Sequence, residues 1–74
     1  MGYYYPRLKD LREDRKDALK QQDIAQVLGT TQQTYSLWER GERELPFHHA
    51  ITLARFYNVS LDYLAGLTNE KQRR

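Results

Sequence analysis

Residues 21–41 restrict the fold of this chain more than any other segment, because they hold two short helical patterns separated by Gly29. In the first pattern, apolar residues recur at helical spacing and define a buried face: Ile24, Ala25 and Leu28. Glycine adopts a left-handed backbone without steric strain, so Gly29 is suited to cap the C-terminus of this helix. The segment therefore predicts two helices joined by a tight turn, which is a helix-turn-helix.

The second pattern has an apolar side and a polar side. Tyr35 and Trp38 are three residues apart and are expected to face the core, and Thr31 precedes the helix as its N-cap. Gly41 follows as a stop signal. The side chains that are left to point outward, or to flank the outer side, are Gln32, Gln33, Ser36 and Leu37.

This outer side predicts contact with DNA bases. A glutamine amide meets adenine N6 and N7 at once in the major groove, and Leu37 is suited to a thymine methyl group. Gln32 and Gln33 lie at the helix start, where a recognition helix approaches base edges most closely. The competing interpretation is that these glutamines are ordinary helix surface and that a single exposed leucine needs no functional explanation.

The flanks of the two helices supply candidates for phosphate contact. The first helix of the helix-turn-helix presents free N–H groups at its N-terminus. We therefore expect Gln21 to bridge a phosphate and the second helix of the motif, with Lys20 adding a positive charge. Arg40 and Arg43 follow the second helix and are further candidates. Such contacts fix the register on DNA without reading its sequence. The alternative for each of these cations is a solvated side chain.

The whole chain predicts an all-α fold with five helices. Its 74 residues leave room for one domain, and no alternating pattern is long enough for a strand. The three further helices are expected in the following places: from Pro6 to a point between Arg15 and Ala18, from Pro46 to Tyr57, and in the short segment between the cap Ser60 and Gly66.

The domain is expected to span residues 6–67, between an N-terminal arm (residues 1–5) and a polar tail (residues 68–74), of which residues 70–74 are expected to fray. The arm contains Tyr3, Tyr4 and Tyr5, which either contact a protein partner or cover the edge of the core. A candidate dimer surface near the C-terminus consists of three leucines, although core packing explains the first two equally well: Leu61, Leu64 and Leu67.

Glu39 is expected to have a structural role, since it lies near the core side of the second helix. A partly buried charge needs a partner, and Arg12, on the helix that follows Pro6, is expected to supply it. Arginine and a carboxylate can pair through two parallel hydrogen bonds. We therefore expect the Arg12–Glu39 pair to hold the second helix of the helix-turn-helix against the helix that follows Pro6.

Composition and spacing argue against several other classes of protein. Cysteine is absent, which excludes disulfides and thiolate metal sites, and no apolar run approaches the length of a membrane span. The N-terminus lacks the pattern of a signal peptide, so we expect a cytoplasmic protein. No acid-base or nucleophile arrangement suggests an enzyme, and we expect no cofactor, metal or small-molecule ligand. His48 and His49 are adjacent, so their side chains are expected to point in different directions on the surface of a helix.

Charge supports nucleic-acid binding only weakly. The net charge is +2 and the isoelectric point is about 9.0, and many basic proteins of this size bind no nucleic acid. The acidic residues of the first helix form a solvated side that DNA would repel, so we expect that side to face away from DNA. They are Asp10, Glu13, Asp14 and Asp17.

Three segments together resemble the helix-turn-helix regulators of the lambdoid phage repressor and Cro type, also called the XRE-like family. The resemblance covers about Leu8 to Leu67. Its first segment runs from Gln21 to Gly29, its second is Tyr35…Trp38-Glu39-Arg40-Gly41, and its third is Asn58-Val59-Ser60-Leu61-Asp62-Tyr63-Leu64. The run Gly29-Thr30-Thr31-Gln32-Gln33 is similar to phage repressors that read adenine with paired glutamines.

The resemblance implies a five-helix domain that binds double-stranded operator DNA as a two-fold dimer. It places Gln21 with Gln32, Gln33 and the Leu37 position toward bases, and Thr31 with Arg40 and Arg43 near the backbone; it also matches the Arg12–Glu39 pair. The chain departs from the family pattern at two points. About two extra residues separate Arg12 from Gln21, which makes the ion pair less secure, and Lys20 stands where a serine or threonine cap is usual.

The predicted function is sequence-specific regulation of transcription, with repression by exclusion of polymerase as its simplest mechanism. A protein-interaction module on the same fold, such as an antitoxin that masks a toxin, is the alternative. Substitution of Gln32 and Gln33 separates the two hypotheses, because only base reading predicts a loss of sequence preference with salt-sensitive general binding retained.

Overall fold

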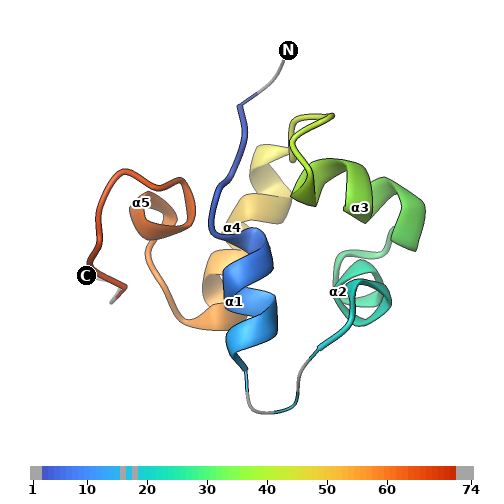
Figure 1. Ribbon diagram of the computed structural model, residues 1–74, viewed down its shortest axis with the longest axis horizontal. Helices are drawn as coiled ribbons and strands as arrows, with labels where there is room; N and C mark the ends of the chain where they lie inside the picture. The colour runs from blue at the N-terminus through green and yellow to red at the C-terminus, as the bar shows by residue number, and fades with distance from the viewer. Residues whose placement is uncertain (1–2, 16, 18, 72–74) are drawn as a thin grey trace.

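The computed structural model describes residues 3–15, 17 and 19–71, and within these residues it contains five α-helices and no strand. The all-α prediction is therefore confirmed. The helices, labelled in Figure 1, have the following bounds: α1 Leu8–Asp14, α2 Gln21–Leu28, α3 Gln32–Glu39, α4 Phe47–Tyr57 and α5 Leu61–Leu64.

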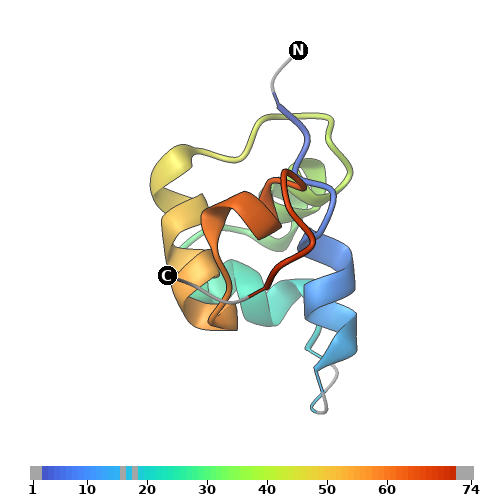
Figure 2. The same ribbon diagram turned by 90° about the vertical axis from the view of Figure 1, so that its left-hand side faces the viewer.

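The helices surround one core, to which each of them contributes. In Figure 1, α2 and α3 lie on one side of α1, α5 lies on the other side, and α4 lies behind α1; Figure 2 shows α5 from the front. The largest fully buried side chains come from all five helices and from the segment before α4: Tyr35, Leu8, Ile24, Leu45, Leu53 and Leu64. None of the helices in the described part of the chain is long and apolar enough to cross a membrane.

The turn between α2 and α3 has the expected geometry. Gly29 is left-handed, with φ of 71°, and its N–H donates to the carbonyl of Gln26. The N–H of Thr30 donates to the carbonyl of Ala25 at 2.9 Å, which completes a Schellman cap. Thr31 then caps α3, since its hydroxyl oxygen accepts from the N–H of Thr34 at 3.2 Å. Local sequence signals therefore fix the angle at which α3 leaves α2.

The first helix is shorter than predicted at both ends. Pro6 does not open it: α1 begins at Leu8, and the Pro6 ring instead lies so close to Gly66 that a Cβ there would be 2.7 Å from Pro6 Cγ. The helix ends at Asp14, because Arg15 has an extended backbone with ψ of 146°. Two residues in the predicted range of its end, 16 and 18, lie outside the described part of the chain.

The described part of the polar tail is attached to the domain, and one of the residues that were expected to fray, Lys71, takes part in a hydrogen bond. Arg7 Nη1 donates to the carbonyl of Thr68 at 3.1 Å, and Arg7 Nη2 donates to Asn69 Oδ1 at 3.0 Å. The N–H of Ser60 donates to the carbonyl of Lys71 at 2.8 Å. Residues 72–74 of the predicted tail lie outside the described residues.

The two C-terminal helices follow the sequence signals closely. Pro46 directly precedes α4, and Asn58 ends it in a left-handed conformation with φ of 56°. The Ser60 hydroxyl accepts from the N–H of Tyr63 at 2.9 Å and so caps α5. One member of the candidate dimer surface is excluded, because Leu64 is 0% exposed and belongs to the core. Leu67, by contrast, is 72% exposed.

Two left-handed glycines provide a matched test of these contacts. A Cβ at Gly29 would meet nothing within 4 Å, so we expect Gly29→Ala to cost only backbone strain, about 1 kcal/mol. A Cβ at Gly41 would lie 2.6 Å from Tyr4 Cδ1, so Gly41→Ala is expected to cost about 2 kcal/mol through strain plus displacement of that ring. Urea unfolding measures both free energies, and equal losses would contradict the contact between Tyr4 and Gly41.

Candidate functional site

Helix α3 buries one side and exposes the other. Tyr35 is 0% exposed and Trp38 is 8% exposed, and their rings meet edge to face with centroids 6.5 Å apart. Gln32 and Gln33, in contrast, are exposed at the start of the helix. The two amides therefore point away from the side that holds the indole, as base contact requires.

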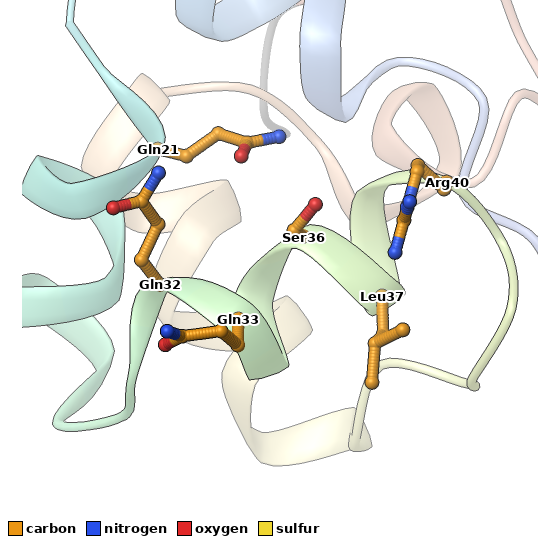
Figure 3. Close-up of a pocket in the computed structure, with 6 residues that line it drawn as sticks. All are labelled: Gln21, Gln32, Gln33, Ser36, Leu37 and Arg40. Atoms are coloured by element: carbon orange, nitrogen blue, oxygen red, sulfur yellow. The ribbon is translucent and has the colours of Figure 1, made fainter.

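The exposed side of α3 forms one wall of an open hollow of about 360 Å³. Figure 3 shows the side chains around it, which come from α2, from α3 and from the residue that follows α3: Gln21, Gln32, Gln33, Ser36, Leu37 and Arg40. The structure thus brings together all five candidates for base contact, with Arg40 beside them. Amide donors and acceptors, a hydroxyl, a guanidinium and an aliphatic side chain are the groups that read base edges.

Gln21 is tied to the end of α3. Its Nε2 donates to Glu39 Oε1 at 3.1 Å, so an amide from the first residue of α2 is held by the last residue of α3. The link to α3 was expected from the sequence, but the acceptor was not identified. Glu39 is therefore connected directly to a side chain that lines the hollow.

The Arg12–Glu39 pair is present and bidentate. Arg12 Nε donates to Glu39 Oε2 at 3.0 Å, and Arg12 Nη2 donates to Glu39 Oε1 at 2.8 Å. Arg12 Nη1 also donates to the carbonyl of Leu19 at 2.9 Å, close to the start of α2. Because Glu39 is only 6% exposed, a single buried carboxylate joins α1, α2 and α3.

The surroundings of Glu39 keep it ionised. Burial acts to raise its pKa, but hydrogen bonds from Arg12 and Gln21 favour the carboxylate more strongly and leave the pKa below its ordinary value. The hydroxyls of Tyr35 and Tyr57 are buried nearby without a hydrogen-bond partner in the described part of the chain. Burial and the negative charge of Glu39 raise both phenol pKa values, that of Tyr57 to about 12.

Of the cations predicted to contact phosphates, only Arg40 lines the hollow. Arg40 Nε lies 3.1 Å from Glu42 Oε2, and the side chains of this pair are 57% and 56% exposed. Arg43 and Lys20 are exposed. Thr31 has its hydroxyl engaged at the N-cap of α3, where it also donates to Thr34 Oγ1 at 3.0 Å.

The unusual cap of α2 is compensated by a residue that sequence analysis missed. A lysine side chain has no acceptor, so Lys20 cannot cap a helix N–H. The Lys20 backbone N–H instead donates to Asp23 Oδ2 at 2.9 Å. An acidic residue three positions after the cap is the sequence signal for this half of a capping box.

The prediction that His48 and His49 point in different directions was wrong. Their ring centroids are 4.0 Å apart, because the partly buried His49 ring packs against Trp38 with centroids 5.2 Å apart and the His48 ring lies against it. Burial, then the neighbouring His48, lowers the His49 pKa. Within the described residues, no group of three or more metal-ligating side chains could hold an ion.

Comparison with known proteins gives a family match. Residues 8–64 match the family model described as helix-turn-helix. The chain is 34% identical over 67 residues to an uncharacterised HTH-type transcriptional regulator of Bacillus subtilis (strain 168), YobD, in a match that covers 90% of this chain and 58% of the relative. A second uncharacterised HTH-type regulator of that strain, YqaE, is 42% identical over 65 residues, or 86% of this chain and 54% of the relative. The chain thus spans little more than half the length of these relatives, and no solved structure matches it significantly.

The lowered pKa of Glu39 predicts that the free energy of unfolding decreases in acid. A carboxyl whose pKa is lowered by folding contributes stability above its ordinary value of 4.5, and this stability is lost as pH falls through the folded value. We expect Glu39→Gln to reduce the free energy of unfolding by about 3 kcal/mol at pH 7, because it leaves Arg12 without its buried counter-charge. The difference from the unsubstituted protein should shrink below pH 4.5.

Urea unfolding between pH 3 and pH 7 measures this difference. Glu13→Gln is the matched control, because the Glu13 carboxylate lies 3.8 Å from Arg12 Nη2 but its side chain is 52% exposed. We expect that control to cost less than about 1 kcal/mol. A pH-independent effect of Glu39→Gln would contradict the stabilising role of the ionised carboxylate.

Proposed function

Because this chain belongs to the XRE-type helix-turn-helix family of DNA-binding transcriptional regulators, we propose that it binds double-stranded DNA sequence-specifically by placing α3 in the major groove. We further propose that it acts as a repressor, by occupying an operator and excluding polymerase. The observation that carries the proposal is the hollow on the exposed side of α3, where all five candidate base-contacting side chains meet.

In this proposal, the two glutamines read adenine and Leu37 contacts a thymine methyl group. Gln32 and Gln33 are exposed, and neither side chain forms a hydrogen bond with the described part of the chain, so their amides are available to bases. Ser36 adds a hydroxyl between them and Leu37. Gln21 contributes at the edge of the site, with its amide oriented by Glu39.

The cations hold the DNA backbone on either side of this hollow. Lys20 lies at the start of α2, whose N-terminus favours a phosphate. Arg40 and Arg43 follow α3, and Arg43 is exposed. Thr31 contributes near the backbone, although its hydroxyl is already used in the cap. Phosphate contacts made by these residues supply affinity and register, and the glutamines supply discrimination.

Binding as a homodimer would extend the site. One copy contacts few base pairs, and a two-fold pair doubles the number read. Exposed Leu67 and partly buried Leu61 remain candidates for contact between copies. Sedimentation of the protein with duplexes selected from a random pool tests this proposal, since a palindromic consensus bound by two copies is the expected result.

Base reading predicts a loss of discrimination when the glutamines are removed. We expect Gln32→Ala and Gln33→Ala each to reduce the affinity ratio between the selected duplex and a scrambled one by about tenfold, since a bidentate base contact is lost. Binding titrations at fixed salt measure this ratio. Gln26→Ala is the matched control, because Gln26 is an exposed glutamine of α2 outside the hollow. Unchanged discrimination in both glutamine variants would favour the protein-interaction alternative.

Phosphate contact predicts a different signature for Arg43. We expect Arg43→Gln to weaken binding to every duplex to a similar extent and to reduce the slope of log affinity against log salt by about 1. Titrations at several salt concentrations with selected and scrambled duplexes measure both effects. Arg55→Gln is the control, because Arg55 is an exposed arginine on α4 to which we assign no DNA contact. A change in base preference would show that Arg43 reads sequence instead.

A further inference from the structure

The three tyrosines near the N-terminus, the tyrosine arm (Tyr3, Tyr4 and Tyr5), join two parts of the fold that are distant in sequence. The Tyr3 side chain contacts the first part, since its hydroxyl donates to the carbonyl of Ala65, which follows α5. The Tyr3 backbone contacts the second part, since its N–H donates to Glu44 Oε1 at 3.0 Å. Tyr5 anchors the arm, since it is 9% exposed in the core and its ring meets that of Tyr3 edge to face at 5.2 Å.

Glu44 belongs to the α3–α4 loop, residues 40–46, which is the main segment that the tyrosine arm contacts. Figures 1 and 2 both show the described residues before α1, drawn in blue, running beside it. Tyr4 covers Gly41, where a Cβ would lie 2.6 Å from its ring, and Gly41 has a left-handed φ of 78°. The loop is thus held at its first turn by Tyr4 and further along by the hydrogen bond between Tyr3 and Glu44.

The same loop begins directly beside the candidate DNA-binding surface. Arg40, its first residue, lines the hollow, and Arg43 is exposed in its middle. The N–H groups of Glu42 and Arg43 both donate to the carbonyl of Leu37, at 2.9 Å and 3.3 Å, so the path of the loop is tied to the last turn of α3. A change in the loop at Gly41 would therefore alter the backbone that links Arg40 to Arg43.

We propose that the tyrosine arm positions the α3–α4 loop for DNA binding, so that Arg40 and Arg43 meet the duplex from one fixed backbone arrangement. This inference rests on the proposed function and adds a role for residues that lie outside the helix-turn-helix. Ordering a loop at the moment of binding costs conformational entropy, and a loop that is already held avoids that cost. Tyr3 and Tyr4 are positioning residues in this arrangement and need not touch the DNA.

The test is a double-mutant cycle between the arm and the arginines. We expect Tyr4→Ala to raise the Kd for the selected duplex about fivefold, because the loop must then be ordered on binding. In the background of Arg40→Gln with Arg43→Gln, the same substitution is expected to change the Kd by less than about twofold, because the side chains through which the arm acts are already lost. Tyr4→Phe should bind like the unsubstituted protein, since the contact with Gly41 uses the ring.

Two controls separate positioning from a general loss of stability. Tyr4 is 50% exposed, so Tyr4→Ala is expected to fold, as circular dichroism would show. Val59→Ala removes core volume beside α5, and we expect it to lower the Tm without changing the Kd well below the Tm. Hydrogen exchange supplies a direct readout, because the amides of Glu42 and Arg43 should exchange faster in Tyr4→Ala while the amide of Leu53 in the middle of α4 does not.

The outcomes are distinct for the arm and for the proposed function. A fivefold effect that disappears in the arginine background, together with faster exchange in the loop, supports the inference. An effect of equal size in both backgrounds, or no effect at all, overturns it and leaves the proposed function intact. If the unsubstituted protein selects no duplex from a random pool, the proposed function fails, and the role of the arm in DNA binding fails with it.

Discussion

The ion pair between Arg12 and Glu39 is the interaction on which the position of α3 most depends. Its two short hydrogen bonds join the middle of α1 to the last residue of α3, and Gln21 brings the start of α2 to the same carboxylate. A buried carboxylate left without these donors would be costly, so the three helices adopt the one arrangement that supplies them. The spacing between Gln21 and the exposed side of α3 follows from this arrangement.

Features that depend only on residues near one another in the sequence could be predicted from it. The bounds of α2 and the cap at Gly29 follow from helical spacing and from the backbone freedom of glycine, and Thr31 and Ser60 carry hydroxyls that cap the helices they precede. The buried and exposed sides of α3 were predictable for the same reason, because three-residue spacing places Tyr35 and Trp38 on one side. The family resemblance relies on these same local signals, and the family match confirms it.

Features that depend on contacts between distant residues were not predictable. Pro6 has an acceptable place at the start of a helix, but packing against Gly66 takes precedence over it. Arg7 carries no local signal that it binds Thr68 and Asn69 in the segment after α5. The acceptor for Gln21 lies 18 residues away in the sequence and becomes evident only once α2 and α3 are packed. The tyrosine arm is a similar case, because its contacts are with Glu44 and Ala65.

The division of α3 into two sides has a consequence for how such a protein diversifies. Every side chain that fastens the helix to its neighbours lies inward, at Tyr35, Trp38 and Glu39, whereas Gln32 and Gln33 form no hydrogen bond with the described residues. Under the proposed function, exchanges at the outward positions would therefore leave the scaffold intact, and mutation there would change the DNA sequence that is bound without unfolding the chain. One architecture can in this way give rise to a repertoire of preferences by a handful of surface replacements.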